Sequence, residues 1–382
     1  MKTLLVSLNY FPPQVGGIST LMFEVAKSLG DDNVCLTGVA SKKKYNGRKV
    51  YRFQSIVSKN RYVCLFSLAL SLFYILIRNK PDLLIIATVD DVYIGYWIYK
   101  YFKIPYVIWA HGNEILYLCN SSSPWPTALK GLKSASKVFA VSRYTAEKVE
   151  SLGVEGERIK IIHPGCDIKK FKIIKNVDMS QLLGKNIPNN MKILITVANL
   201  VKRKGHDKVI ESLPSILEKQ TNLIYLIVGE GRDKRYLQDL AIRHNVEDNI
   251  IFFGRASDEQ LVKLYSGADI FVMPSRNREK ENDVEGFGIV YLEANCCEVP
   301  VIGGKSGGIP DAIEHGKSGF LVDPQNTEEL SEKILTLLTD ESMREQMADY
   351  GRKRVVSQFA WEIMGKNVRR EIQKVIAQYK KL

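Results

Sequence analysis

Residues 3–29 read TLLVSLNYFPPQVGGISTLMFEVAKSL and combine three structural signals in a fixed order. A short apolar run, Thr3 to Leu8, is typical of a buried strand. A loop with two prolines and two glycines follows, and the stretch from Ser19 to Leu29 then has the periodicity of an amphipathic helix. The segment therefore predicts a strand, a loop and a helix, which is how a parallel α/β sheet begins.

The same alternation continues along the chain. Further short apolar runs, separated by segments of helical length, lie at residues 83–87, 106–110, 138–141 and 159–162. After a polar, lysine-rich segment from Lys172 to Asn190, which we take as a linker, a second series begins. Its expected strands are residues 192–198, 224–228, 250–253, 270–273, 299–303 and 319–322. The pattern predicts an α/β protein with two Rossmann-like, doubly wound parallel sheets.

The length of 382 residues also predicts more than one domain, because a single hydrophobic core seldom organises so long a chain. We expect an N-terminal Rossmann-like domain at residues 1–180 and a C-terminal one at residues 181–360. Residues 361–382 are expected to form a helix that packs back on the N-terminal domain.

Composition argues against several classes of protein. The six cysteines and five histidines show no C-x-x-C pair and no other spacing typical of a metal site, so we expect reduced, buried cysteines and no metal. The N-terminal apolar run is too short for a signal peptide. The longest apolar stretch, Cys64 to Ile77, has 14 residues where a membrane-spanning helix needs about 20. A cytoplasmic location is therefore expected.

The positive charge is concentrated in the N-terminal half. Residues 1–190 contain 26 Lys and Arg against 13 Asp and Glu, which more than accounts for the net charge of +12. Because basic clusters at residues 42–61 adjoin the apolar stretch at 64–77, peripheral docking on the anionic inner face of the cytoplasmic membrane is one interpretation. A buried helix with solvated lysines is the other. The half contains no recognisable nucleic-acid-binding module, so no nucleic acid is expected as a partner.

Residues 285–293, EGFGIVYLE, place two carboxylates around the expected start of a helix. Free N–H groups at a helix start attract phosphate oxygens, and glycines let a ligand approach closely. Glu285 would then accept hydrogen bonds from sugar hydroxyls, and Glu293, about two turns further on, from the two hydroxyls of a ribose. On spacing alone, Glu285 as a helix cap and Glu293 as a surface or salt-bridged residue is an equally good interpretation.

A group of basic residues, VANLVKRKG at 197–205, directly follows the first expected strand of the C-terminal domain. Ligands of open α/β sheets bind at the carboxyl ends of the strands. Lys204, beside Gly205, is therefore expected to neutralise charge that develops on a diphosphate leaving group. For Lys202 a solvated basic turn is as good an interpretation.

Taken together, these segments resemble the GT-B retaining glycosyltransferases of family 4, in the right order along nearly the whole chain. The residues from Glu285 to Glu293 match the family's E-x7-E element, which is its most specific motif. The other matches are a glycine loop with Gly16 and Gly17, an H-G-x-E loop from His111 to Glu114, a signature at 163–171, Lys204-Gly205, V-G-x-G at 228–231, Gly254 and Arg255 at a strand end, and closing motifs at 307–311 and 326–330.

The resemblance implies two domains facing a central cleft, with the acceptor bound by the first domain and a nucleotide sugar by the second. His111, Lys204 and Glu285 are the implied catalytic residues, and Glu114 is an implied acceptor-positioning residue. The implied donor-binding residues are Gly16, Gly17, Asn199, Arg203, Lys204, Gly254, Arg255, Glu285, Gly286, Phe287, Gly288, Ile289 and Glu293. The implied reaction is hexosyl transfer with retention of configuration, without a metal or other cofactor.

One position departs from the family pattern, because Asn199 stands where an arginine usually contacts the donor diphosphate. Arg203 or Lys202 is a candidate to supply the missing charge. The run from Met273 to Ala294 is most similar to the branch of phosphatidylinositol mannosyltransferases, which also includes polysaccharide-assembly enzymes. The similarity favours GDP-mannose as donor, with a UDP-hexose as the alternative, and a lipid-linked or glycan acceptor in cell-envelope polysaccharide or glycolipid assembly.

Three other functions are weighed against this one. Asn199 makes a catalytically silent nucleotide-sugar-binding protein conceivable, and a GT-B sugar-nucleotide epimerase would need no acceptor. An NAD-dependent oxidoreductase is disfavoured, because no G-x-G-x-x-G follows the first expected strand of either domain.

Overall fold

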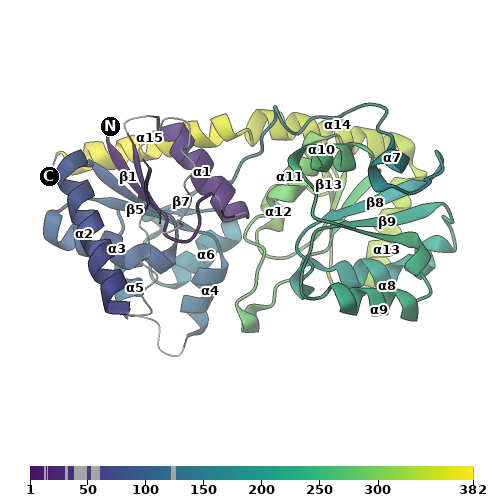
Figure 1. Ribbon diagram of the computed structural model, residues 1–382, viewed down its shortest axis with the longest axis horizontal. Helices are drawn as coiled ribbons and strands as arrows, with labels where there is room; N and C mark the ends of the chain where they lie inside the picture. Colours follow the sequence, from purple (N-terminus) through teal and green to yellow (C-terminus); the bar gives the residue numbers. More distant parts are fainter. Residues whose placement is uncertain are drawn as a thin grey trace. The chain divides into compact units, whose positions relative to one another are not determined.

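The computed structural model describes residues 1–12, 14, 16–30, 33–37, 50–52, 61–121 and 126–381. The chain divides into two α/β units, one made of Met1–Pro164 with Trp361–Leu382 and the other of Gly165–Ala360 (Figure 1). Each unit contains one parallel sheet covered by helices, so the prediction of two Rossmann-like, doubly wound sheets is confirmed.

The sheet of the first unit has the strand order β3-β2-β1-β4-β5-β6-β7, and every pair is parallel. Strands buried along their whole length, such as β1, are typical of parallel sheets covered on both faces. The chain runs from β1 to β2 and β3 on one side and continues on the other side from β4, so β1 and β4 flank a topological switch point. The strands are β1 (Thr3–Val6), β2 (Val34–Thr37), β3 (Val50–Arg52), β4 (Leu83–Ile86), β5 (Tyr106–Ala110), β6 (Lys137–Ala140) and β7 (Ile159–Ile161).

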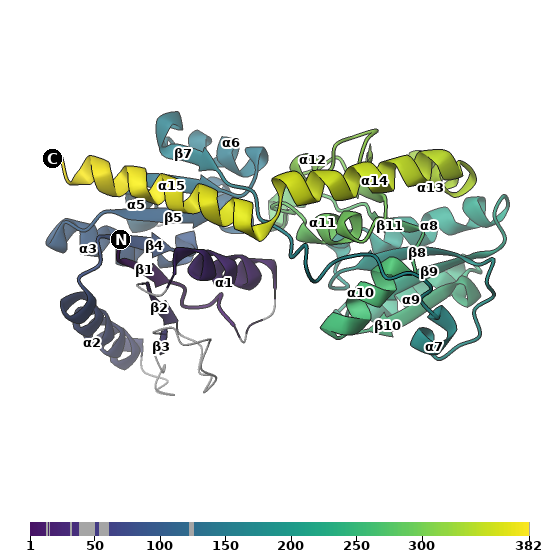
Figure 2. The same cartoon turned by 90° about the horizontal axis from the view of Figure 1, so that it is seen from above.

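Helices connect these strands and cover both faces of the sheet. The C-terminal helix α15 packs along α1 (Figure 2). The contact is close, because a Cβ at Gly365 would lie 2.5 Å from the Cβ of Ser28, and Arg369 donates a hydrogen bond to the Ser28 carbonyl. The helices of the first unit are α1 (Gly17–Leu29), α2 (Arg61–Asn79), α3 (Val92–Phe102), α4 (Asn113–Asn120), α5 (Pro126–Ser134), α6 (Arg143–Ser151) and α15 (Trp361–Tyr379), with short 3-10 turns η1 (Val89–Asp91) and η2 (Gly156–Arg158).

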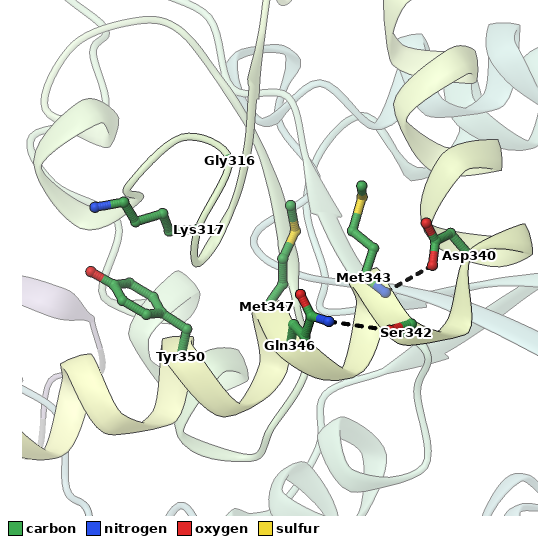
Figure 3. Close-up of a pocket in the computed structure, with 8 residues that line it drawn as sticks. All are labelled: Gly316, Lys317, Asp340, Ser342, Met343, Gln346, Met347 and Tyr350. Carbon is green, nitrogen blue, oxygen red and sulfur yellow. Dashed lines mark hydrogen bonds between the residues drawn. The ribbon is translucent and has the colours of Figure 1, made fainter.

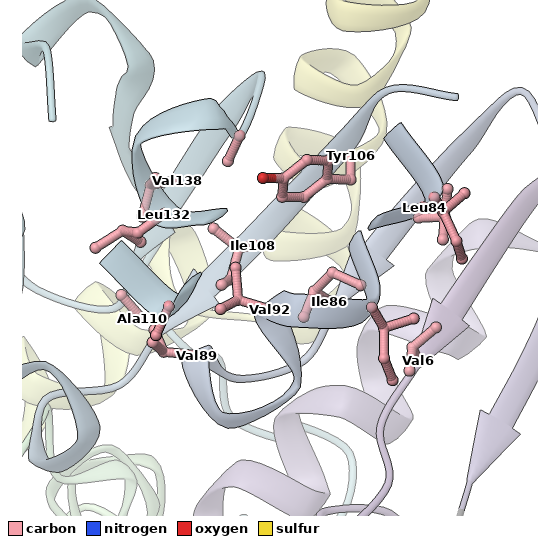
Figure 4. Packing of buried hydrophobic residues seen from close by; sticks show 14 of the residues in the cluster. Val6, Leu84, Ile86, Val89, Val92, Tyr106, Ile108, Ala110, Leu132 and Val138 are labelled. Carbon is pink, nitrogen blue, oxygen red and sulfur yellow. The ribbon is translucent and has the colours of Figure 1, made fainter. Parts of the chain in front are cut away.

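A hydrophobic core cluster of the first unit lies between the sheet and the helices on one of its faces (Figure 4). Alternate residues of the strands, such as Ile86 and Ile108, meet Val92 of α3 and Leu132 of α5 there. Tyr106 is fully buried in this core, and its hydroxyl donates a hydrogen bond to the Gly131 carbonyl. This packing fixes the carboxyl ends of β4 and β5, from which candidate site residues extend.

Helix α2 contains the apolar stretch for which two interpretations were open. Leu68, Ile75 and Leu76 are buried in the core. The opposite face carries four residues spaced i, i+3, i+4 and i+7 that are 50–56% exposed: Leu70, Phe73, Tyr74 and Ile77. The helix thus packs on the core and also presents an apolar face to solvent. Within the described residues, no helix is both long enough and apolar enough to span a membrane.

The sheet of the second unit has the order β10-β9-β8-β11-β12-β13, so its switch point lies between β8 and β11. The strands are β8 (Lys192–Val197), β9 (Leu223–Val228), β10 (Ile250–Gly254), β11 (Ile270–Met273), β12 (Val301–Gly304) and β13 (Gly319–Val322). The helices are α7 (Met179–Leu183), α8 (His206–Leu217), α9 (Lys234–Arg243), α10 (Asp258–Ser266), α11 (Ile289–Cys296), α12 (Ile309–Ala312), α13 (Thr327–Thr339) and α14 (Glu341–Gln358), with 3-10 turns η3 (Lys202–Lys204), η4 (Glu247–Asn249) and η5 (Glu279–Glu281).

The division between the units falls at Pro164, before the expected linker at 172–190 and the expected boundary at 180. Packing explains the difference. Cys166 forms a β-bridge with Ala360, and Phe171 packs edge-on against Tyr265 with ring centroids 6.0 Å apart. These contacts fasten the polar segment after residue 164 to the second unit.

Candidate active site

The switch point of the second unit brings together two loops that are far apart in the sequence. Gly205 ends the loop after β8 with a φ of 78°, and a Cβ there would collide with the carbonyl of Pro274, which follows β11. Only glycine fits this close approach. In addition, the backbone N–H of Arg276 donates to the Arg203 carbonyl at 2.9 Å. Lys204 is thereby held against the loop that carries Glu285.

Glu285 is the centre of a compact group of charges. Its Oε2 lies 2.5 Å from the Nζ of Lys204 and 2.5 Å from a terminal nitrogen of Arg203. Burial alone would raise the pKa of Glu285, but the charges and hydrogen bonds of Lys204 and Arg203 outweigh burial and lower it to about 2. The carboxylate therefore stays ionised at neutral pH and can accept hydrogen bonds from a ligand.

The basic residues around Glu285 differ in how far their charges are already neutralised by carboxylates of the protein. Arg203 also pairs with Asp283 at 2.6 Å, so two carboxylates already neutralise its guanidinium. For Lys204, burial lowers the pKa despite the pairing with Glu285. Asn199, the departure from the family pattern, and Lys202 are both exposed on the same loop.

The helix start after Glu285 is formed as the sequence predicts. Gly288 caps α11 with a φ of 92°, and a Cβ there would lie 2.6 Å from the ring of Tyr291. Phe287 is buried and packs against Phe359 with ring centroids 6.0 Å apart, and Ile289 is the first residue of α11. The segment from Gly286 to Ile289 thus presents backbone N–H groups at the N-terminus of an eight-residue helix.

Glu293 lies on α11 and is neither a surface carboxylate nor a salt-bridged one. Its Oε2 accepts a hydrogen bond from the hydroxyl of Tyr265 at 3.1 Å, and among the described residues it forms no ion pair. Burial raises the pKa of Glu293 to about 7, because the Tyr265 bond and the more distant charge of Lys170 only partly offset the loss of hydration. Among the described residues, the Glu293 carboxylate has the Tyr265 hydroxyl as its one side-chain donor, and the hydroxyls of a bound diol would supply further donors.

Gly254 is the last residue of β10, which is an edge strand of the sheet, and Arg255 follows it. Arg255 forms an exposed ion pair with Glu230 at 2.8 Å, and its side chain is 82% accessible to solvent. Glu230 and Arg255 thus follow the ends of the neighbouring strands β9 and β10.

In the first unit, Gly16 is the N-cap of α1 and Gly17 is its first residue. His111 follows β5, and its Nε2 lies 2.8 Å from the carbonyl oxygen of Ala87. Because a carbonyl only accepts, Nε2 donates in this bond, and Nδ1 of a neutral ring is left as an acceptor. Glu114 accepts a hydrogen bond from the backbone N–H of His111 at 2.5 Å, so its carboxylate holds the histidine loop in place.

Several residues around the two switch points were not expected from the sequence. Asp283 pairs with Arg203, and Arg276 forms a buried ion pair with Asp207. In the first unit, the carboxylate of Asp91 accepts from the backbone N–H of Leu8 at 3.1 Å. The partners of these acidic residues lie 69 to 83 residues away in the sequence. No local sequence pattern identifies pairs that are so far apart.

A separate cavity of about 410 Å³ in the second unit lies between the turn before β13 and the N-terminal part of α14 (Figure 3). None of the expected site residues lines it. Its lining residues are Gly316, Lys317, Asp340, Ser342, Met343, Gln346, Met347 and Tyr350. Elsewhere too, in the part of the chain that the structure describes, no group of three His, Cys, Asp or Glu side chains is arranged to hold a metal ion.

Comparison with known proteins identifies the family. The model of the group 1 glycosyl transferases matches residues 183–354, and that of glycosyltransferase family 4 matches residues 15–170. This chain belongs to the family 4 glycosyltransferases. The resemblance that the motifs predicted is therefore confirmed. Glu285 with its partners Lys204 and Arg203, and the start of α11, lie within the matched residues 183–354.

Two relatives of this family 4 glycosyltransferase have names that state their donor and activity. A GDP-mannose-dependent monoacylated alpha-(1-6)-phosphatidylinositol monomannoside mannosyltransferase from Corynebacterium glutamicum is 35% identical over 60% of this chain and 59% of its own length. A GDP-mannose-dependent alpha-(1-6)-phosphatidylinositol monomannoside mannosyltransferase from Mycobacterium tuberculosis is 32% identical over 67% of this chain and 66% of its own length. The chain thus matches about three fifths to two thirds of the length of these relatives.

The fold of the family is shared with solved structures. The Anabaena protein HepE, in complex with UDP and glucose, superposes with a TM-score of 0.81 at 21% identity, over 98% of this chain and all of that one. The two sheets described above are therefore those of a GT-B glycosyltransferase, as predicted from the sequence.

Proposed function

We propose that this family 4 member is a retaining, metal-independent hexosyltransferase that uses a nucleotide sugar as donor and a lipid-linked or glycan molecule as acceptor. The observation that carries the proposal is the contact of Lys204 with Glu285 at the switch point of the second unit. This contact lies at the carboxyl ends of β8 and β11, where open α/β sheets bind ligands. It provides a cation and an ionised carboxylate that can accept hydrogen bonds.

The chemistry assigned to this cluster is electrostatic. Cleavage of the bond between sugar and diphosphate leaves negative charge on the diphosphate, and Lys204 with the backbone N–H groups at the start of α11 would stabilise it. Glu285 would accept hydrogen bonds from the hydroxyls of the transferred sugar. In this proposal Arg203 positions Glu285 and does not replace the arginine absent at Asn199, because Asp283 and Glu285 occupy its guanidinium.

Glu293 is assigned to the ribose of the donor. A partly buried carboxylate with one phenolic donor would be stabilised by two further hydrogen bonds, which the vicinal hydroxyls of a ribose would provide. GDP-mannose is the preferred donor of the proposal because both named relatives are GDP-mannose-dependent mannosyltransferases, and a UDP-hexose is the alternative.

Thermal unfolding of the full chain with sugar nucleotides tests the donor assignment. We expect GDP-mannose at 100 times its Kd to add about 2.7 kcal/mol to stability and to raise the melting temperature by several degrees. E293Q replaces one of the two acceptor oxygens of Glu293 by an amide donor, so we expect roughly a 10-fold or greater loss of affinity.

The matched control is E259Q, the same substitution at an exposed carboxylate on α10. Equal affinity in E293Q and E259Q would reject the ribose role of Glu293. No shift with GDP-mannose, UDP-hexoses or their nucleotides would reject donor binding altogether, and binding without transfer to any acceptor would favour a silent protein.

We also propose that the first unit docks peripherally on the anionic inner face of a membrane. The exposed α2 residues Leu70, Phe73, Tyr74 and Ile77, hereafter the α2 face, have the spacing of one helix stripe. Arg78 adjoins them and donates a hydrogen bond to the Tyr74 hydroxyl at 3.0 Å. Apolar residues beside cations are typical of helices that lie in an anionic interface. The basic residues at 42–49 lie outside the described residues.

Sedimentation with phospholipid vesicles tests the docking. We expect the wild-type chain to bind vesicles containing 30 mol% phosphatidylglycerol more tightly than pure phosphatidylcholine, and F73S/I77S to bind them about 10-fold more weakly or worse, because two half-exposed apolar side chains are lost from the interface. I242S is the matched control, since Ile242 is 58% exposed on α9 of the other unit. Equal binding by all three proteins would contradict the assignment.

A further inference from the structure

The switch point of the first unit also gathers polar side chains, and the donor chemistry proposed above uses few of them. Loops from three neighbouring strands end there: the loop after β1, the η1 turn after β4 and the start of α4 after β5. Leu8 of the first loop and Asp91 of η1 are joined by the hydrogen bond from the Leu8 N–H to the Asp91 carboxylate. Asp91 is 3% exposed, so this carboxylate serves the connection of the two loops and is not open to a ligand.

Asp90, the preceding residue, differs from Asp91 in its exposure to solvent and in its hydrogen bonding. It is exposed, and in the described chain its carboxylate forms no hydrogen bond and no ion pair. Partial burial of the carboxyl group raises its pKa, and the nearby His111 ring opposes the rise. A carboxylate that has lost part of its hydration without gaining a protein donor favours a ligand that brings hydroxyl donors.

The neighbours of Asp90 are polar groups of complementary kinds. The phenol of Tyr10 is close enough to Asp90 for that charge to contribute to its raised pKa, after the larger effect of burial. In its neutral form His111 contributes an acceptor at Nδ1, since its Nε2 is engaged with Ala87. Thr88, on the same turn and 2% exposed, has a hydroxyl without a hydrogen-bond partner in the described chain. An unsatisfied buried hydroxyl is costly unless a ligand or water completes it.

Glu114, the acceptor-positioning residue that the resemblance implied, has a different role in this geometry. Its carboxylate binds the backbone N–H of His111 and so is engaged within the loop. Asp90 is the carboxylate beside the histidine that remains available.

We propose that Asp90 binds the acceptor: its carboxylate accepts a hydrogen bond from a hydroxyl of a sugar or cyclitol ring and orients that ring beside His111. The inference rests on the glycosyl transfer proposed above. Tyr10, whose hydroxyl can both donate and accept, contacts the same ring. The site takes a polyhydroxylated ring because its free groups are a carboxylate, a phenol and an imidazole nitrogen, which match alternating hydroxyl donors and acceptors.

Steady-state kinetics with the full chain test the role of Asp90. The probes are the methyl glycosides of mannose, glucose and N-acetylglucosamine, myo-inositol 1-phosphate, and vesicles containing phosphatidylinositol, each with GDP-mannose and with UDP-glucose as donor. For whichever probe the wild-type chain glycosylates, we expect D90N to raise the acceptor KM about 10-fold or more, because a hydrogen bond to a charged group is lost. The donor KM and the slow hydrolysis of the donor by water should change less than twofold.

Two variants separate binding from folding. E157Q alters an exposed carboxylate of the same unit, on the η2 turn, and should leave both KM values unchanged. D90E keeps the charge and should recover part of the acceptor affinity. An acceptor KM in D90N equal to that of the wild type would overturn the role of Asp90 while leaving glycosyl transfer intact.

The class of acceptor has its own test in the same experiment. Donor binding and hydrolysis without transfer to any sugar or cyclitol probe would overturn a polyhydroxylated acceptor. Failure to bind or hydrolyse either donor would instead reject the proposed function on which the inference depends.

Discussion

K204A is expected to lower kcat for sugar transfer roughly 10²- to 10³-fold, the usual cost of removing one preorganised group that stabilises transition-state charge. The side chain of Lys204 is 13% exposed, and its Nζ lies 2.5 Å from Glu285 at the carboxyl edge of the sheet. Because so little of the side chain is exposed, water would replace it poorly when charge develops on the leaving diphosphate. The loss should appear in kcat and in kcat/KM alike, because the interaction strengthens only as the bond breaks.

Transfer assays at saturating donor measure this effect, with K208A as the matched control. Lys208 lies in the first turn of α8, four residues after Lys204, and pairs with Glu211 at 2.7 Å. A K204A enzyme with an unchanged kcat and a raised donor KM would mean that Lys204 binds the ground state and the transition state equally well. In that case the start of α11 would have to carry the electrostatic stabilisation.

The elements that the sequence predicts best are the strands of the two sheets. Tyr106–Ala110, Ile270–Met273 and Gly319–Val322 begin and end where expected, because parallel strands covered on both faces leave uninterrupted apolar runs. The strands β2 and β3 were not predicted. β2 contributes only four residues, Val34–Thr37, and β3 three, and runs so short do not stand out from their surroundings.

The site residues divide in the same way between local and long-range information. Glu285, Gly288 and Glu293 belong to one strand-loop-helix segment, so spacing alone predicted their order around the start of α11. The pairing of Arg203 with Asp283 was beyond such reasoning, because the contact depends on two loops that meet only after the sheet has formed. For the same reason the sequence could not distinguish Asp90 from Glu114 as the free carboxylate beside His111.

D207A is expected to destabilise the second unit by about 3–5 kcal/mol, which is the largest stability change that we anticipate for a single substitution. Asp207, in the first turn of α8, pairs with Arg276 at 2.7 Å, and their side chains are 8% and 6% exposed. Another terminal nitrogen of Arg276 already has no hydrogen-bond partner within the described chain. Without Asp207 the buried guanidinium would have no counter-charge, and its desolvation would no longer be offset.

Thermal unfolding of the full chain measures the loss, expected to be on the order of 10 °C for a unit of this size. D349A is the control, because Asp349 pairs with Lys353 on an exposed turn of α14 and such pairs contribute less than about 1 kcal/mol. The decisive comparison is the double variant D207L/R276M. It removes both charges and fills their volume, so it should recover most of the stability that D207A loses. If the double variant were no more stable than D207A, the loss would come from the hydrogen bond and packing at the start of α8 and not from an unpaired buried charge.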